Sequence, residues 1–407
     1  MTKKFSTEND GIYTGVIHDK FLRRRVVYEK SSVLQFSELV HVVDTRFMQQ
    51  QSTLLELGLA RLALFEAFCL SSMKFQTNKN FLWIIRADPD LHPSIVDRLQ
   101  ILLEGRQNFI LIGSNNNPEG FGRPKPKLPF KTFLRFDNTN APVWNGNISL
   151  VEEAYDRAAA GGVLLETRLD SDDGLNIHFI ETIQTEARKH LMIDNSNESY
   201  DLWRLWCIES RVEWHPLNPY PETPEIKAAN KSFPEGYLIY YTEKGCSTPG
   251  LTFGYGPGAS RESLGFDHLR HDEISQKIGT CNETSHGIEV KCVSRLSKLA
   301  PGAVRARTTT SAGMSNVITG HSDIDKKNGF KRLTKNKQFI KQFTKQESFW
   351  AGVTNLLSVS IEDVKFARSI VLERMQLIGQ DNLKGQCTGG HSCKNATQSI
   401  LVKLTEK

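Results

Sequence analysis

The feature that most constrains this chain is an alternation of short apolar runs with segments of helical periodicity. The apolar runs are rich in β-branched residues and end at polar or turn-forming residues, as strands buried on both faces do. The expected order is strand 38–47, helix 52–76, strand 80–90, helix 93–104, a strand within 107–120 that runs into a polar turn, an irregular segment at 114–147, helix 149–160, strand 163–169 and helix 175–190. This alternation predicts an α/β fold with a Rossmann-like, mostly parallel sheet flanked by helices.

Beyond residue 200 the pattern weakens. We expect further strands at 203–213 and 236–242, a loop-rich region at 245–320, and a helical segment at 347–379. The 407 residues are 39% hydrophobic, enough for one large domain or two ordinary ones.

We therefore expect three parts. Residues 1–36 form a polar N-terminal extension, and residues 37–320 form the main domain with a loop-rich half. Residues 321–407 form a basic, helical C-terminal segment with a loosely ordered tail.

The charge of the chain gives only weak information about partners. A formal net charge of +5 suits an anionic ligand but is too small to indicate nucleic acid. The stretch 326–345 combines lysines and arginines with phenylalanines, a pattern that occurs in nucleic-acid binding and also on solvated helix faces. We favour the solvated face and expect no nucleic-acid partner.

The compartment is left open. No run of 18 apolar residues occurs, so we expect no membrane span. The N-terminus MTKKFSTENDGIYTG lacks the apolar part of a signal peptide, which predicts a cytoplasmic protein as written. A Golgi or secretory location follows instead if an N-terminal anchor is missing. In an oxidising compartment, Cys281 with Cys292 and Cys387 with Cys393 could close small loops.

Three aspartates follow the strand at 163–169 within four positions: Asp170, Asp172 and Asp173. At ~5.5 Å and an effective dielectric of ~20, each pair of carboxylates repels by about 3 kcal/mol. Residues two apart on an extended chain face the same way, and ligands of parallel sheets bind beyond the carboxyl ends of the strands. A divalent cation such as Mg²⁺ or Mn²⁺ would offset the repulsion and hold a diphosphate. The alternative is a solvated turn with Asp173 as a helix N-cap.

The sequence TRLDSDDGL at 167–175 resembles the signature of the putative rhamnosyl transferases, which are similar to GT-A glycosyltransferases. Three further segments resemble the first strand, helix and second strand of that family: HVVDTRF at 41–47, RLALFEAFCLSS at 61–72 and KFQTNKNFLWIIRADPD at 74–90. The resemblance spans about residues 38–260. Family members often have Asn where this chain has Ser171, a mild departure because serine is also polar.

This resemblance implies a GT-A-like fold, a nucleotide-sugar donor and metal-dependent transfer to a hydroxyl of a glycan or other acceptor. Asp170 and Asp172 correspond to the DxD positions and would hold Mn²⁺ or Mg²⁺ with the donor diphosphate. Asp173 would contact the sugar or a water on the metal, which makes it a catalytic candidate. Rhamnose rests on the family name alone.

Two arginines, Arg46 and Arg168, each end a strand after a threonine, where a guanidinium can bind phosphate. We interpret Arg46 as donor-binding, with an ion pair to Asp44 as the alternative. Arg168 is a second donor-site candidate, although we favour a counter-charge to the aspartates. Asp88 could bind the base or ribose, but an Asp-Pro turn is the simpler interpretation.

The segment LGFDHLRHDEIS at 264–275 contains candidates for the proton acceptor and for a third metal ligand. From this segment we select Asp272 as catalytic base and His271 as metal ligand. The alternative is a charged surface helix. The glycine-rich stretch 245–260 is interpreted as a loop, either one that closes over donor or acceptor or an ordinary surface loop.

Two other functions remain possible from the residues. A nucleotidyl- or phosphotransferase would use the same paired aspartates, but no P-loop or kinase motif occurs. A non-catalytic carbohydrate- or cation-binding module could be built on the same sheet. The glycosyltransferase is the leading hypothesis.

Overall fold

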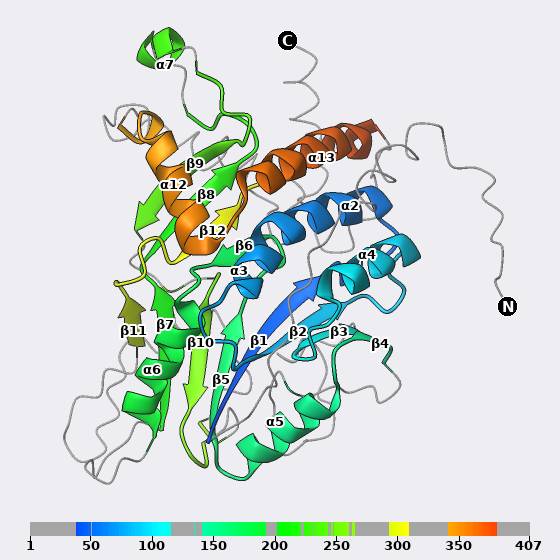
Figure 1. The fold of residues 1–407 in the computed structure, drawn as a ribbon, viewed down its shortest axis with the longest axis vertical. Coiled ribbons are helices and arrows are strands. Elements are labelled where there is room, and N and C mark those ends of the chain that lie inside the picture. Colours follow the sequence, from blue (N-terminus) through cyan, green and yellow to red (C-terminus); the bar gives the residue numbers. More distant parts are fainter. Residues whose placement is uncertain are drawn as a thin grey trace, which may run out of the picture.

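The protein folds into a mixed α/β structure with two sheets (Figure 1). The structure is a computed structural model that describes residues 38–49, 51–114, 134, 141–192, 202–220, 224–229, 231–242, 246, 248–259, 263–264, 293–308 and 341–380.

The larger sheet has eight strands in the order β11-β7-β10-β5-β1-β2-β3-β4. Its strands are β1 (Leu39–Phe47), β2 (Leu82–Ala87), β3 (Phe109–Gly113), β4 (Val143–Asn145), β5 (Val163–Arg168), β7 (Trp203–Ile208), β10 (Leu251–Tyr255) and β11 (Val293–Leu296). The central run β5-β1-β2-β3 is parallel, and so is β11 with β7. Strand β10 is antiparallel to both of its neighbours, and β4 is antiparallel to β3. The predicted α/β class is confirmed, and the sheet is parallel at its centre but mixed overall.

The smaller sheet was not predicted. It has the order β6-β12-β8-β9, formed by β6 (Asp173–Leu175), β8 (Ser210–His215), β9 (Tyr237–Thr242) and β12 (Ala303–Ala306). The expected single strand at 203–213 is in fact β7 and β8, which belong to different sheets. Because β6 begins at Asp173, the chain enters the second sheet at the third of the aspartates.

Helices cover both faces of the larger sheet. The helices are α2 (Leu55–Leu64), α3 (Ser71–Lys74), α4 (Pro93–Leu103), α5 (Ser149–Ala159), α6 (Phe179–Leu191), α7 (Pro224–Ala229), α12 (Gln346–Leu357) and α13 (Ile361–Gln380), with a π-helical segment η1 (Phe65–Leu70) between α2 and α3. One core layer joins α2, α4 and α6 to residues such as Val43, Trp83 and Leu165. The other joins α5 to residues such as Val42, Ile84 and Leu164.

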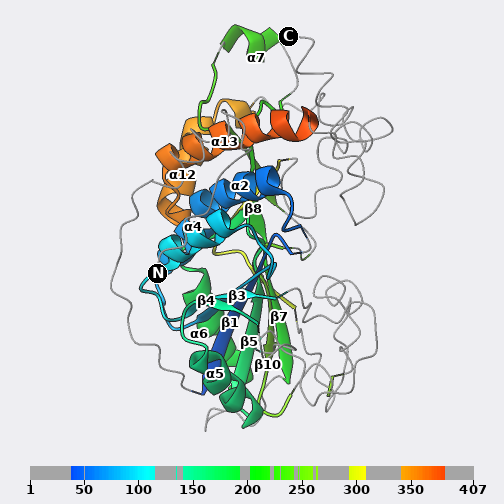
Figure 2. The same cartoon turned by 90° about the vertical axis from the view of Figure 1, so that its right-hand side faces the viewer.

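The predicted C-terminal helical segment consists of two helices, which separate at Ser358, a residue with left-handed backbone. Figure 1 shows α13 lying alongside α2, and Arg374 of α13 donates to Glu56 of α2. Figure 2 shows the same pair of helices from the side, with α4 next to them. Buried residues of α12 and α13 are part of the main core. Within the described residues, no helix combines the length and apolar character that a membrane crossing requires.

The glycine-rich stretch 245–260 is not a loop alone. It contains β10, which is fully buried between β5 and β7. Gly254 permits this position, since a Cβ there would lie 2.6 Å from the Trp206 ring. From the sequence alone, a glycine that close packing requires cannot be distinguished from a glycine that forms a turn.

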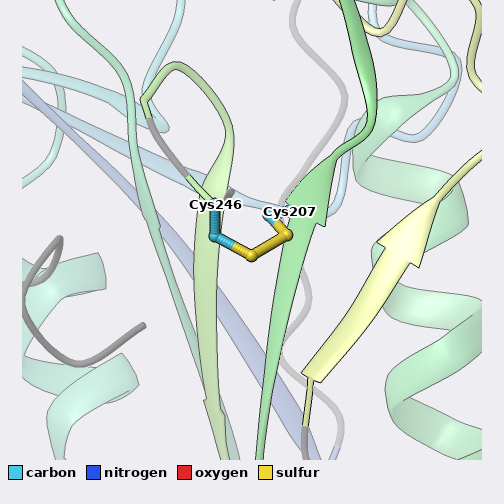
Figure 3. Close-up of a disulfide and its surroundings, with 2 residues drawn as sticks. All are labelled: Cys207 and Cys246. Atoms are coloured by element: carbon cyan, nitrogen blue, oxygen red, sulfur yellow. A yellow bond between two sulfur atoms is a disulfide. The ribbon is translucent and has the colours of Figure 1, made fainter. Parts of the chain in front are cut away.

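One disulfide joins Cys207 of β7 to Cys246, which precedes β10 (Figure 3). In the described part of the chain Cys69 is a buried free thiol. The cysteine pairs that could close small loops in an oxidising compartment, Cys281–Cys292 and Cys387–Cys393, lie outside the described residues.

Candidate functional site

Charged residues gather where the parallel strands β1, β2 and β5 end. Parallel register places Asp44 beside Arg168 and Arg46 beside Arg86. These residues lie on the same face of the sheet as the apolar layer under α5, because side chains two apart on a strand share a face. This face of the sheet is therefore apolar along most of its length and carries charged side chains at the carboxyl ends of the strands.

Asp44 is the centre of this ionic cluster. Its two carboxylate oxygens accept from Nε of Arg86 at 2.7 Å and from a terminal nitrogen of Arg168 at 2.8 Å. Burial would raise the pKa of Asp44, but the charges of Arg86, Arg168 and Arg46 together hold that pKa below its usual value. Asp44 is thus an anion that fixes two arginines, a role that the sequence suggested only as an alternative for Arg46.

Asp170 is the most exposed of the three aspartates, with 21% of its side chain accessible. Arg168 lies 3.5 Å from one carboxylate oxygen of Asp170, measured from Nε, and the hydroxyl of Thr248 donates to the other at 3.4 Å. The amide of Asp173 donates to the carbonyl of Asp170 at 3.1 Å and closes a turn. Arg168 therefore connects Asp44 with Asp170, as a counter-charge does.

Asp173 is buried, and so is Asp172. Asp173 lies in β6 rather than at a helix N-cap, so the alternative interpretation of the aspartates is wrong on this point: α6 begins only at Phe179. One oxygen of Asp173 accepts from the amide of Ala306 at 3.1 Å. Its Oδ2 is buried and has no hydrogen-bond partner within the described part of the chain.

The surroundings of Asp173 disfavour its ionised form. Burial raises its pKa well above the usual value, and the negative charges of Asp172 and Asp170 act in the same direction, against Arg305 and Arg307. Burial and the neighbouring carboxylates therefore favour the protonated form of Asp173 over its carboxylate. A bound cation would favour the carboxylate, which is the chemistry expected of a cation site.

Among the described residues, no three His, Cys, Asp or Glu side chains converge as a closed metal shell. An open site is still compatible with these residues, because Mg²⁺ is often bound by one or two carboxylates together with substrate phosphates. Asp170 and Asp172 supply only oxygen ligands. Asp173 interacts electrostatically with both, and its buried Oδ2 has no hydrogen-bond partner among the described residues. The donor set fits a hard divalent cation. His271 and Asp272 lie outside the described residues.

The remaining donor-site candidates have defined positions. Arg46 is half-buried and lies close enough to Asp44 to lower its pKa. Asp88 is buried and organises the turn between β2 and α4: its carboxylate accepts from the amide of Asp90 at 3.0 Å, and its carbonyl accepts from Leu91 at 3.1 Å. This geometry is that of the Asp-Pro turn.

Sequence reasoning missed Arg305 and Thr248. Arg305 lies opposite Asp173 in the antiparallel pairing of β12 with β6. Both residues come from the region interpreted as loops, where no periodicity announces a strand. Arg305 and Arg307 are two apart, a spacing that is a weak sign of a charged strand face.

The comparison with known families concerns two strands of the larger sheet, β2 and β3, and the helices around them. Residues 57–119 match the family model described as putative rhamnosyl transferase. The match begins in α2, includes η1, α3, β2, α4 and β3, and contains Arg86 and Asp88. It agrees with the resemblance of the segments 61–72 and 74–90. No curated protein matches the chain.

Proposed function

We propose that this protein is a metal-dependent glycosyltransferase with a GT-A-like arrangement. It would move a sugar, with rhamnose as the first candidate, from a nucleotide-diphosphate donor to a hydroxyl of a glycan or other acceptor. The observation that carries the proposal is the group of three aspartates at the carboxyl end of β5, two of them buried and one joined to Arg168. The family match supports the reaction class.

In this proposal Asp170 and Asp172 hold Mn²⁺ or Mg²⁺, and His271 completes the set of protein ligands. The bound cation would supply Lewis-acid stabilisation of the departing diphosphate. Arg168 keeps Asp170 oriented through its contacts with Asp44 and Asp170. Arg46 binds the donor phosphates, and Asp88 lies at the end of the neighbouring strand, where base or ribose would approach.

The transfer itself requires a proton acceptor. The acceptor oxygen forms a bond to the anomeric carbon while the bond from that carbon to the diphosphate oxygen breaks. We assign the hydroxyl proton to the carboxylate of Asp272. Asp173, buried beside the aspartate pair, contacts the sugar or an ordered water.

The test is a screen of nucleotide sugars with purified protein, with and without Mn²⁺. Wild type should turn over at least one nucleotide sugar only with the cation, and Asp170→Asn and Asp172→Asn should each abolish turnover. The matched control is Asp156→Asn on the exposed face of α5, which should retain full activity. Turnover of nucleoside triphosphates without any nucleotide sugar would favour a phosphotransferase. Cation or glycan binding without turnover would favour a binding module.

A further inference from the structure

Asp170 is held through both of its carboxylate oxygens. Arg168 approaches Oδ1 at 3.5 Å, and the Thr248 hydroxyl donates to Oδ2 at 3.4 Å. Arg168 is the last residue of β5, two residues before Asp170, whereas Thr248 comes from a segment 78 residues later in the sequence. The orientation of Asp170 therefore depends on how that later segment is fixed.

Two contacts fix the segment that carries Thr248. The amide of Gly250 donates to the carbonyl of Arg168 at 3.0 Å, directly before β10 pairs with β5. On the other side, Cys246 is bonded to Cys207 of β7, the strand on the far side of β10 (Figure 3). Thr248 thus lies between a backbone hydrogen bond and a covalent cross-link.

These contacts restrict rotation of the Asp170 carboxylate. Ligating carboxylates are commonly oriented by hydrogen bonds from a second layer of residues, and the loss of such a bond typically weakens metal binding about 10–100-fold. Asp170 is partly exposed, so packing alone restrains it less than it restrains buried Asp172.

We propose that Thr248 is a positioning residue for Asp170, and that the Cys207–Cys246 disulfide fixes the backbone that presents Thr248. The part that concerns metal binding rests on the proposed function; the part that concerns the disulfide does not. Reduction of the two cysteines should then loosen the backbone at Thr248 and weaken cation binding at Asp170.

The redox step is a two-electron exchange. Dithiothreitol transfers two electrons and two protons to the disulfide, which becomes the two thiols of Cys207 and Cys246, and the reagent becomes its cyclic disulfide. The cross-link is lost, while the hydrogen bond from Gly250 to Arg168 remains possible.

Hydrogen exchange tests the structural part without any substrate. Reduction of the wild type should speed exchange of the Gly250 amide at least tenfold, because this amide lies between the cross-link and β5. The double variant Cys207→Ser/Cys246→Ser should show the faster exchange from the start and no response to the reductant. Equal exchange in oxidised, reduced and double-variant protein would overturn the role of the disulfide.

Substitution at Thr248 tests the positioning role. Thr248→Val should raise the apparent dissociation constant for Mn²⁺ about tenfold, measured by calorimetry and by the Mn²⁺ dependence of turnover, while kcat at saturating Mn²⁺ changes less than twofold. Thr248→Ser keeps the hydroxyl and should restore the affinity. The matched control is Thr77→Val, which removes a hydroxyl bonded to Glu181 at 2.8 Å on the exposed surface and should leave Mn²⁺ binding unchanged.

The failures can be told apart. If no nucleotide sugar is turned over but Mn²⁺ still binds and weakens in Thr248→Val, the proposed reaction is wrong and the positioning role stands. If turnover is present and Thr248→Val binds Mn²⁺ like the wild type, the positioning role is wrong and the reaction stands.

Discussion

Arg86 donates from Nε to Oδ1 of Asp44 at 2.7 Å, and neither side chain is accessible to solvent. A charged pair this deep is costly to break, since the loss of one partner leaves a buried charge uncompensated. Arg168 donates to the other oxygen of the same carboxylate. Asp44 on β1 is therefore the counter-ion of two arginines, one on each of the strands that flank β1.

Asp44→Asn should therefore lower the free energy of unfolding by about 3–5 kcal/mol. Asparagine keeps the size of the side chain but removes the charge that faces both guanidinium groups. Urea unfolding at pH 7 measures the loss. The comparison variant is Arg157→Ala, which breaks an exposed pair with Glu153 and should cost about 0.5 kcal/mol or less. A loss below 1 kcal/mol for Asp44→Asn would contradict the central role of this carboxylate.

His41 should make stability depend on acidity. It is fully buried on β1 and shares a 2.8 Å hydrogen bond with Thr167, and burial lowers its pKa to about 3. Between that value and the ordinary pKa of about 6.5, the unfolded chain binds a proton that the folded chain does not, so stability falls as pH falls. From pH 7 to pH 5 this residue should cost about 2 kcal/mol.

His41→Gln removes the titrating ring while leaving an amide that can bond Thr167. The variant should lose about 2 kcal/mol less than the wild type between pH 7 and pH 5. Unfolding curves at the two pH values measure the difference, and the pH 7 value serves as the reference for any packing effect. Parallel losses in both proteins would show that His41 does not titrate as described.

The Cys207–Cys246 disulfide should contribute directly to stability. The cysteines are 39 residues apart, and the loss of loop-closure entropy for such a cross-link corresponds to about 3–4 kcal/mol. Cys207→Ser/Cys246→Ser should unfold at correspondingly lower urea concentration, and dithiothreitol should shift the wild type toward the variant. An unchanged midpoint after complete reduction would argue against the pairing.

Gly174 fixes the approach of β6 to the π-helical segment η1. A Cβ at this position would lie 2.9 Å from the carbonyl oxygen of Phe68 and 3.0 Å from a methyl group of Val304. Gly174→Ala should therefore cost about 1–3 kcal/mol, because backbone rather than a flexible side chain must move. Turnover should fall as well, since Gly174 follows Asp173.

Gly352 of α12 is the matched control for this substitution. A Cβ there would meet nothing within 4 Å. Gly352→Ala should be neutral or stabilise the protein by up to about 1 kcal/mol, because alanine is the better helix former. If both variants change the free energy of unfolding by the same amount, the close approach of Gly174 to Phe68 does not decide the cost of the substitution.

The strands and helices that follow a clear period could be predicted. Helix α4 was placed from Pro93 onward, and β1, β5 and α5 lie where the apolar pattern indicates. Strand β10 was missed because Gly254 and the glycine-rich flanks of the strand resemble a loop, and β6 was missed because three residues carry no periodic signal.

The sequence by itself determined that a central parallel sheet forms and that three carboxylates follow its β5 strand, because apolar periodicity and chain order are local properties. The tertiary structure alone decided that Asp44 serves both Arg86 and Arg168, that Arg305 lies opposite Asp173, and that Thr248 contacts Asp170. The pairing of strands brings these partners together across separations of 42 residues, for Asp44 and Arg86, to 132 residues, for Asp173 and Arg305. Register is set by the packing of whole layers, and no short stretch of sequence encodes it.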